Sequence, residues 1–160
     1  MRSIAAWSLG LSVVLSAVAG TGVVVADSKK QDNRCDKYQF IGGSYSWFGA
    51  YADAETRGGR LATISSVEEA TCVYQVTSGS AWLGGSDIEV DQEWRWSASP
   101  KNGLFYKGEY DNINRSFGYT NWSGGEPNGG TGENCLQFSS GGSWNDLNCS
   151  IGLPYVIRYP

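Results

Sequence analysis

Side chains that carry oxygen, without any imidazole or thiol group, gather within residues 126–146. They are Glu126, Asn128, Glu133, Asn145 and Asp146. Carboxylate and amide oxygens favour hard cations, and calcium accepts a larger and less regular set of them than magnesium does. With the backbone carbonyl of Asp146 added, these residues supply enough oxygen for one calcium ion in a surface loop. An ordinary solvated loop is the alternative that the residue types alone leave open.

The neighbours of these residues have the properties of a supporting frame. The bond before Pro127 can adopt cis at small cost, which would turn the side chains on either side of it the same way, although an ordinary trans proline is the alternative. Trp144 precedes Asn145 and can anchor it in a core. Cys135 and Cys149 bracket the second group of ligands at a spacing that a disulfide could close, and a crosslink would lower the cost of ordering the loop. Since close carboxylates repel each other, we expect the loop to be looser without metal.

The composition excludes several classes of function. The chain has no histidine, which removes the usual general base and the commonest zinc ligand and excludes Ser-His and Cys-His catalysis. The net charge is −4 and no cluster of lysine and arginine is present, so we expect no nucleic-acid partner. Glu126, Glu133 and Asp146 could imitate the carboxylates of a glycosidase, but that reaction needs one acid with a raised pKa, and a bound cation would keep all three ionised. We therefore expect a binding protein and no enzyme.

The first 26 residues are typical of a secretory signal peptide. Arg2 is followed by an apolar stretch from Ile4 to Ala19 and by small residues before Asp27. We expect cleavage there, a secreted domain over residues 27–160 and no membrane span, with a membrane anchor as the alternative. Four cysteines in an exported chain indicate disulfides in preference to free thiols.

Hydrophobic periodicity and capping residues predict an α+β fold. Ser46 can cap a helix from about Trp47 to Arg57, and the recurrence of Phe48, Tyr51, Ala52 and Glu55 at helical spacing indicates its packed face. A second helix opens at Ser65 or Ser66 and ends near Val76. Short strands are expected at 38–41, 61–64, 81–84, 94–96, 135–138 and 155–159. Residues 97–134 show little periodicity, and a loop of that length in a small domain is usually functional.

Other acidic and aromatic residues have simpler interpretations. Asp87, Glu89, Asp91 and Glu93 alternate before a strand, and we expect a solvated hairpin there because Gln92 occupies the position where an EF-hand needs glycine. The tryptophans are expected in the core in preference to sugar-stacking positions. They are Trp47, Trp82, Trp94, Trp96, Trp122 and Trp144.

Several motifs, in order, resemble the C-type lectin family over about residues 38–159. The resemblance lies in the calcium and sugar site, in the segment between two helices and in a central strand. The matching residues are Gly125-Glu126-Pro127-Asn128, Gly132-Glu133-Asn134-Cys135, Trp144-Asn145-Asp146, Gly58-Gly59-Arg60-Leu61-Ala62-Thr63-Ile64 and Ala81-Trp82-Leu83-Gly84.

The resemblance implies a role for each oxygen ligand. Glu126, Asn128, Glu133, Asn145 and Asp146 would bind one Ca²⁺, Asp146 also through its backbone carbonyl, and two adjacent sugar hydroxyls would complete the coordination. The Glu-Pro-Asn order implies glycans with equatorial 3- and 4-hydroxyls, as in mannose, N-acetylglucosamine and fucose-like sugars. Members of this family that bind a protein or ice instead of sugar provide the alternative. Because a single shallow sugar site binds weakly, a homo-oligomer would supply avidity.

The sequence also departs from the family. The usual disulfide between the first helix and the last strand is missing, since Ala54 and Ile157 occupy its positions, and we expect an apolar contact there. The resemblance implies Cys135–Cys149 as the usual short pair and leaves Cys35 to pair with Cys72. Gly129 and Asn134 occupy ligand positions of an auxiliary calcium site, so we expect that site to be absent. Of three N-glycosylation patterns, at Asn114, Asn121 and Asn148, only Asn114 looks available.

Overall fold

A computed structural model describes residues 34–99, 103–109 and 115–160. The expected signal peptide at 1–26, the cleavage before Asp27 and Asn114 lie outside the described residues. In chain order the elements are β1 (Tyr38–Tyr45), α1 (Trp47–Thr56), β2 (Arg60–Leu61), α2 (Val67–Val76), β3 (Ala81–Ser86), β4 (Glu93–Trp96), β5 (Leu104–Lys107), β6 (Arg115–Ser116), the 3₁₀ turn η1 (Gly130–Gly132), β7 (Cys135–Phe138), β8 (Trp144–Leu147) and β9 (Leu153–Arg158).

Both predicted helices are present and begin at the predicted caps. The Ser46 hydroxyl accepts a hydrogen bond from a backbone N–H of the first turn of α1, and Ser66 does the same for α2. Glu69 returns its carboxylate to the backbone N–H of Ser65, at 2.9 Å, which satisfies another free donor at that helix end. Gly58 follows α1 with a φ of +78°, a conformation that favours glycine over other residues.

The prediction of the buried face of α1 is wrong. Phe48 is 57% exposed and Ala52 is also exposed. The buried residues are Trp47, Ala50 and Ala54. The Trp47 indole N–H donates to the carbonyl of Leu83 at 2.8 Å, so a contact with β3 decides which side of the helix faces inward. The two small alanines on this side let the helix pack closely on the sheet.

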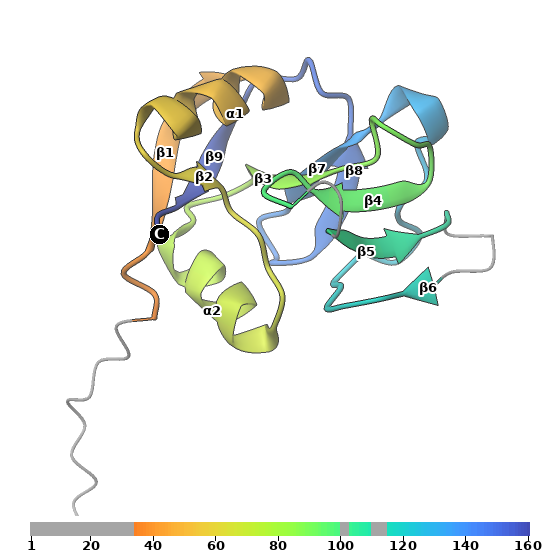
Figure 1. Ribbon diagram of the computed structural model, residues 1–160, viewed down its shortest axis with the longest axis horizontal. Coiled ribbons are helices and arrows are strands. Elements are labelled where there is room, and N and C mark those ends of the chain that lie inside the picture. Colours follow the sequence, from red (N-terminus) through yellow and green to blue (C-terminus); the bar gives the residue numbers. More distant parts are fainter. Residues whose placement is uncertain (1–33, 100–102, 110–114) are drawn as a thin grey trace, which may run out of the picture. The chain divides into compact units, whose positions relative to one another are not determined.

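One sheet connects all the strands. Its main order is β1-β9-β3-β4-β5-β6, while β2 pairs with β9, and β7 joins β3 to β8. The β3–β9 contact is parallel and the other ladders are antiparallel. The two helices lie beside β1, β2 and β9, and the strands β4–β6 lie on the other side of β3 (Figure 1). The predicted α+β class is confirmed.

The predicted strands differ from the structure in three places. The strand expected at 61–64 is only Arg60–Leu61, although the Ala62 N–H still donates to Val156. Strands β5 and β6 and the turn η1 lie within the expected loop at 97–134. Strand β8 was not predicted, because Asn145 and Asp146 have low β propensity and the ladder with β7 outweighs it.

Aromatic and aliphatic side chains form two buried clusters. Five predicted core tryptophans are at most 9% exposed. Besides Trp47, they are Trp82, Trp94, Trp96 and Trp144. Trp122 is half-buried against Trp94 and Trp144. Ala54 and Ile157 are both 0% exposed in the cluster beneath α1, where the apolar contact was expected.

Among the helices of the described ranges, none has the length and apolar character needed to cross a bilayer.

Candidate functional site

The five predicted ligands come from two neighbouring stretches of chain. Glu126, Asn128 and Glu133 lie in the irregular segment around η1, which leads into β7. Asn145 and Asp146 lie on β8, opposite Gln137 and Leu136 of β7. The β7–β8 ladder therefore brings the two stretches together.

Asp146 is the centre of this arrangement. Its Oδ2 atom accepts hydrogen bonds from the backbone N–H groups of Asn128, at 2.9 Å, and Gly129, at 2.7 Å. These bonds tie the segment after the cis Glu126–Pro127 bond to β8. The residue is only 1% exposed, so the expectation of an exposed loop position is wrong for Asp146. The antiparallel pairing of β8 turns Trp144 and Asp146 toward the interior and leaves Asn145 half-buried.

Two buried carboxylate oxygens in this region have no hydrogen-bond partner. They are Glu126 Oε2 and Asp146 Oδ1. Burial is the main reason why the pKa of Glu126 rises to about 7. A hydrogen bond that protonated Glu126 can donate to the Asp146 carboxylate raises this pKa further, as do the charges of Asp146 and Glu133. The pKa of Glu133 is also raised, first by burial and then by the charge of Asp146. Burial and neighbouring carboxylates thus both disfavour the charged forms of Glu126 and Glu133.

The two amide ligands turn their nitrogen atoms toward the backbone. Asn128 Nδ2 donates to the carbonyl of Gly125 at 3.2 Å. Asn145 Nδ2 donates to the carbonyl of Asp146, which is the carbonyl expected to bind the ion. Rotation of the Asn145 amide would release that carbonyl. Because an amide has both a donor end and an acceptor end, the same side chains can serve a cation or a hydroxyl.

The site does not form a finished metal cage. Over the part of the chain that the structure describes, no three histidine, cysteine, aspartate or glutamate side chains stand where they could hold a metal ion together. The residues nevertheless fit calcium chemically, because the unpartnered oxygens of Glu126 and Asp146 are hard anionic donors.

Gly129 is a part of the site that sequence reasoning did not identify. A β-carbon at this position would overlap Cβ and the carboxylate oxygen Oε2 of Glu133. The Gly129 N–H also donates to Asp146. From the sequence this glycine was only a missing ligand of an auxiliary site. The adjacent glycines Gly129 and Gly130 were the available signal of a close approach.

Asp87 is the second residue whose place was not anticipated. It was expected in a solvated hairpin, but it is only 5% exposed, and that expectation is wrong for this residue. Its Oδ2 atom accepts the N–H of Gln92 at 3.0 Å. Burial is the main cause of a pKa of about 6, and the charges of Asp91 and Asp146 raise it further. Asp87 therefore adds to the negative charge near Asp146.

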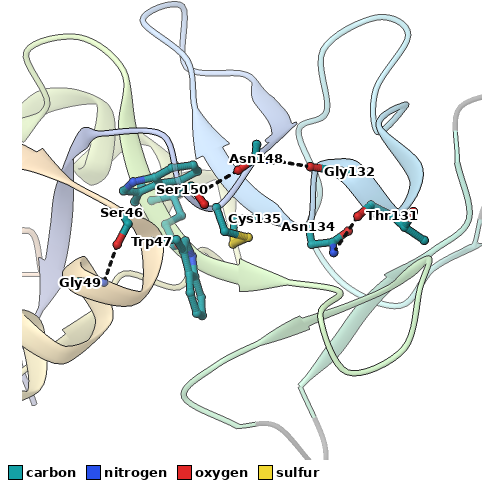
Figure 2. Close-up of a disulfide and its surroundings, with 12 residues drawn as sticks. Ser46, Trp47, Gly49, Thr131, Gly132, Asn134, Cys135, Asn148 and Ser150 are labelled. Carbon is teal, nitrogen blue, oxygen red and sulfur yellow. Dashed lines mark hydrogen bonds between the residues drawn. A yellow bond between two sulfur atoms is a disulfide. The ribbon is translucent and has the colours of Figure 1, made fainter.

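A covalent and aromatic frame supports the site. Cys135 and Cys149 form a disulfide next to β7, and Figure 2 shows this bond beside Trp47 and the turn at Gly132. The second disulfide joins Cys35 to Cys72, so the structure contains both expected pairs. Trp144 is fully buried among aromatic rings, which confirms it as an anchor.

The ligand region has no deep pocket among the hollows that are described. A hollow of about 550 Å³ is lined by residues of β2 and the end of β9, including Arg60 and Arg158. Another of about 300 Å³ lies between α1 and the β3–β4 hairpin, beside Phe48 and Ile88. Neither of these two hollows includes any of the five ligands.

Comparison with known proteins identifies the family. A family model described as the lectin C-type domain matches residues 43–156. Halomucin of Haloquadratum walsbyi is 34% identical over 76% of this chain, and this chain spans only 1% of that protein. The cow CD23 C-type carbohydrate-recognition domain, solved in the presence of a GlcNAc2Man3 oligosaccharide, has a TM-score of 0.62 and 31% identity, covering 77% of this chain and 87% of that chain.

A structural neighbour with a different name matches with the same TM-score and a lower identity. Herring type II antifreeze protein has a TM-score of 0.62 and 26% identity, covering 77% of this chain and 89% of that chain. The fold is therefore shared by proteins named for different ligands. The family match over most of the described residues, together with the fold, shows that this chain belongs to the C-type lectin domain family.

Proposed function

We propose that this chain binds a saccharide through a calcium ion held by Glu126, Asn128, Glu133, Asn145 and Asp146. The observation that carries the proposal is the pair of buried, unpartnered oxygens on Glu126 and Asp146. A buried anionic oxygen without a partner is costly, and a divalent cation offsets that cost. Burial and the Asp146 carboxylate raise the pKa of Glu126 to about 7, and a bound cation would stabilise its charged form.

Calcium, when bound, would supply coordination positions for two adjacent hydroxyls of the sugar. The carboxylates of Glu126 and Glu133 would accept hydrogen bonds from those hydroxyls, and the amides of Asn128 and Asn145 would donate to them. Asp146 orients the loop by accepting the N–H groups of Asn128 and Gly129. The carboxylate at 126 and the amide at 128 thereby set the polarity of the hydrogen bonds.

The proposed sugar class follows from that polarity. Glu126 before the proline and Asn128 after it correspond to the Glu-Pro-Asn version of the family, which implies equatorial 3- and 4-hydroxyls. Mannose, N-acetylglucosamine and fucose-like sugars present such pairs. The 31% identity to a carbohydrate-recognition domain solved with a mannose-containing oligosaccharide supports a sugar ligand.

We propose that the domain is secreted and has no catalytic activity. The N-terminal sequence of residues 1–26 and the two disulfides support export. C-type lectin domains are binding domains. Although Glu126 has a raised pKa beside Asp146, as a glycosidase acid would, calcium at this site would keep both carboxylates ionised.

A glycan array in calcium and in chelator tests the proposal. We expect binding to mannose-type glycans in calcium and loss of that binding in chelator. The exposed Glu68 on α2 offers a control, because E68Q removes one negative charge far from the site in the chain and should bind like the parent. Binding that survives chelator would contradict the proposal.

Ice binding is the second candidate, because a type II antifreeze protein matches the fold with the same TM-score as the sugar-binding domain. A depression of the freezing point below the melting point, combined with an empty glycan array, would favour it. A protein target would give an empty array without that depression. The intact set of five ligands favours sugar over both.

A further inference from the structure

One side chain joins the turn η1 to the chain that follows β8. Asn148 Nδ2 donates to the carbonyl of Gly132 at 3.2 Å, and its Oδ1 accepts the backbone N–H of Ser150 at 2.9 Å. Figure 2 shows Asn148 between Gly132 and Ser150, beside the disulfide. Gly132 immediately precedes Glu133, one of the proposed calcium ligands.

The Asn148 end of this link is firmly held. The next residue, Cys149, is bonded to Cys135. The carbonyl of Cys149 accepts the backbone N–H of Trp47 at 2.8 Å, which fixes it to the start of α1. The carbonyl of Asn148 accepts the N–H of Ile151 at 3.0 Å. Asn148 therefore projects from a rigid part of the frame.

The Gly132 end has weaker support of its own. The Gly132 N–H donates to Gly129 at 3.0 Å and the Glu133 N–H reaches the carbonyl of Gly130 at 3.5 Å, so both bonds stay within the turn. Asn134 Nδ2 donates to Thr131 at 3.3 Å, again locally. The start of the turn is tied to β8 by the Gly129 N–H, which donates to Asp146, and its end is tied to the residue after β3, because the Asn134 carbonyl accepts the N–H of Asp87 at 3.3 Å. Glycine-rich turns lose much conformational entropy on folding, and the Asn148 bond restrains the Gly132 carbonyl between these two points.

We propose that Asn148 is a positioning residue for the calcium site. Its amide holds the carbonyl of Gly132 and so places the backbone of Glu133 against the ligands on β8. This inference rests on the proposed function, because it assigns Glu133 to the ion. The Asn148 amide nitrogen is also the atom that would carry a glycan if the N-glycosylation pattern there were used. The proposal gives this nitrogen a structural role, as the donor to Gly132.

Asn148→Ser tests the proposal with little disturbance. The serine hydroxyl can still accept the N–H of residue 150 in a local turn, but it is too short to reach Gly132, and no charge is introduced near the ligands. Ser150→Ala is the matched control. It removes the glycosylation pattern as N148S does, yet it keeps both Asn148 bonds, because residue 150 donates through its backbone.

Calcium affinity and thermal stability are measured for both variants by calorimetry and thermal unfolding. We expect N148S to bind calcium about 3- to 10-fold more weakly than S150A, less than the loss typical of a side chain bonded directly to a metal ligand. In chelator, the midpoint temperature of thermal unfolding of N148S should equal that of S150A. Calcium should raise this temperature less in N148S than in S150A. Equal calcium affinity in the two variants, or a midpoint lowered as much in chelator as in calcium, would overturn the positioning role.

Hydrogen exchange in chelator tests the link without calcium. The amides of residues 130–133 should exchange several-fold faster in N148S than in S150A. If the parent chain bound no calcium, the proposed function would fail, while faster exchange at these residues would still support Asn148 as the restraint on the turn. Unchanged exchange would refute that restraint.

Discussion

The apolar cluster beneath α1 and the carboxylate of Asp146 are both buried, but their surroundings differ. Ala54 and Ile157 are 0% exposed and belong to a hydrophobic cluster. Asp146 is 1% exposed, and one of its carboxylate oxygens has no partner. The first region consists of apolar side chains of the chain itself, whereas we propose that a bound cation completes the second. Stability and binding should therefore respond to separate substitutions.

Asp146→Asn should have the largest effect on the binding region. The asparagine oxygen can still accept the N–H groups of Asn128 and Gly129, so the loop should stay attached, but the negative charge for the ion is lost. We expect calcium affinity to fall by about 100-fold or more and sugar binding to disappear. Calorimetry measures the loss, circular dichroism checks the fold, and E68Q is the charge-matched control. Binding like that of the parent would remove Asp146 from the site.

Ile157→Ala should affect the other region alone. Removing a fully buried isoleucine side chain leaves a cavity, which lowers the free energy of unfolding by about 2 to 5 kcal/mol. Denaturant unfolding in chelator measures that change. The calcium affinity of the folded variant should equal that of the parent. A parallel loss of calcium affinity would show that the two regions are coupled, and that stability and binding do not respond to separate substitutions.

Lowering the pH should weaken calcium binding through Glu126. Its pKa of about 7 in the folded, metal-free protein is above the ordinary value of 4.5, so the proton competes with the ion as the pH falls through 7. Between pH 7.5 and 5.5 we expect calcium affinity to fall by about 10-fold or more. The free energy of unfolding of the metal-free protein depends on pH in the opposite direction. Because the pKa of Glu126 is raised in the folded protein, its proton stabilises the fold fully below pH 4.5, and this stabilisation is lost as the pH rises through 7.

Glu126→Gln provides the control for this pH dependence. The variant should bind calcium more weakly than the parent, and its affinity should change less between pH 7.5 and 5.5. A parent affinity that is constant over this range would contradict the assignment of Glu126 to the ion.

Gly129→Ala should have the smallest of these effects. The added methyl group would overlap Glu133 and push its carboxylate away, so we expect calcium affinity to fall by about 3- to 10-fold. Gly132→Ala is the matched control, because nothing lies within 4 Å of a β-carbon there. Equal affinities in the two variants would mean that Glu133 can relax at no cost.

The sequence predicted features that depend on local chemistry and on family motifs. The caps at Ser46 and Ser66 were predictable because a serine hydroxyl satisfies a free N–H of the first turn wherever the helix packs. Motif spacing also placed the five proposed ligands on two stretches of chain, which the β7–β8 ladder brings together. The cis bond before Pro127 is also present as anticipated.

Features that depend on distant contacts were not predictable. The inward side of α1 is decided by the bond from Trp47 to Leu83, and the burial of Asp87 by the hairpin that folds over it. The unpartnered oxygens of Glu126 and Asp146 emerge only when β8 meets the loop. Residue types and their spacing along the chain do not identify such contacts, because they do not show which distant side chains will lie close together in space.

Calorimetric titration of Ca²⁺ into the folded, oxidised chain tests the central claim most directly. If the proposed calcium site is correct, the titration gives saturable heat for one ion per chain, and this heat is lost in D146N and kept in E68Q. A later titration with a mannoside then gives heat only when calcium is present. A parent protein that gives no heat with calcium, or that binds the mannoside equally in chelator, would contradict it.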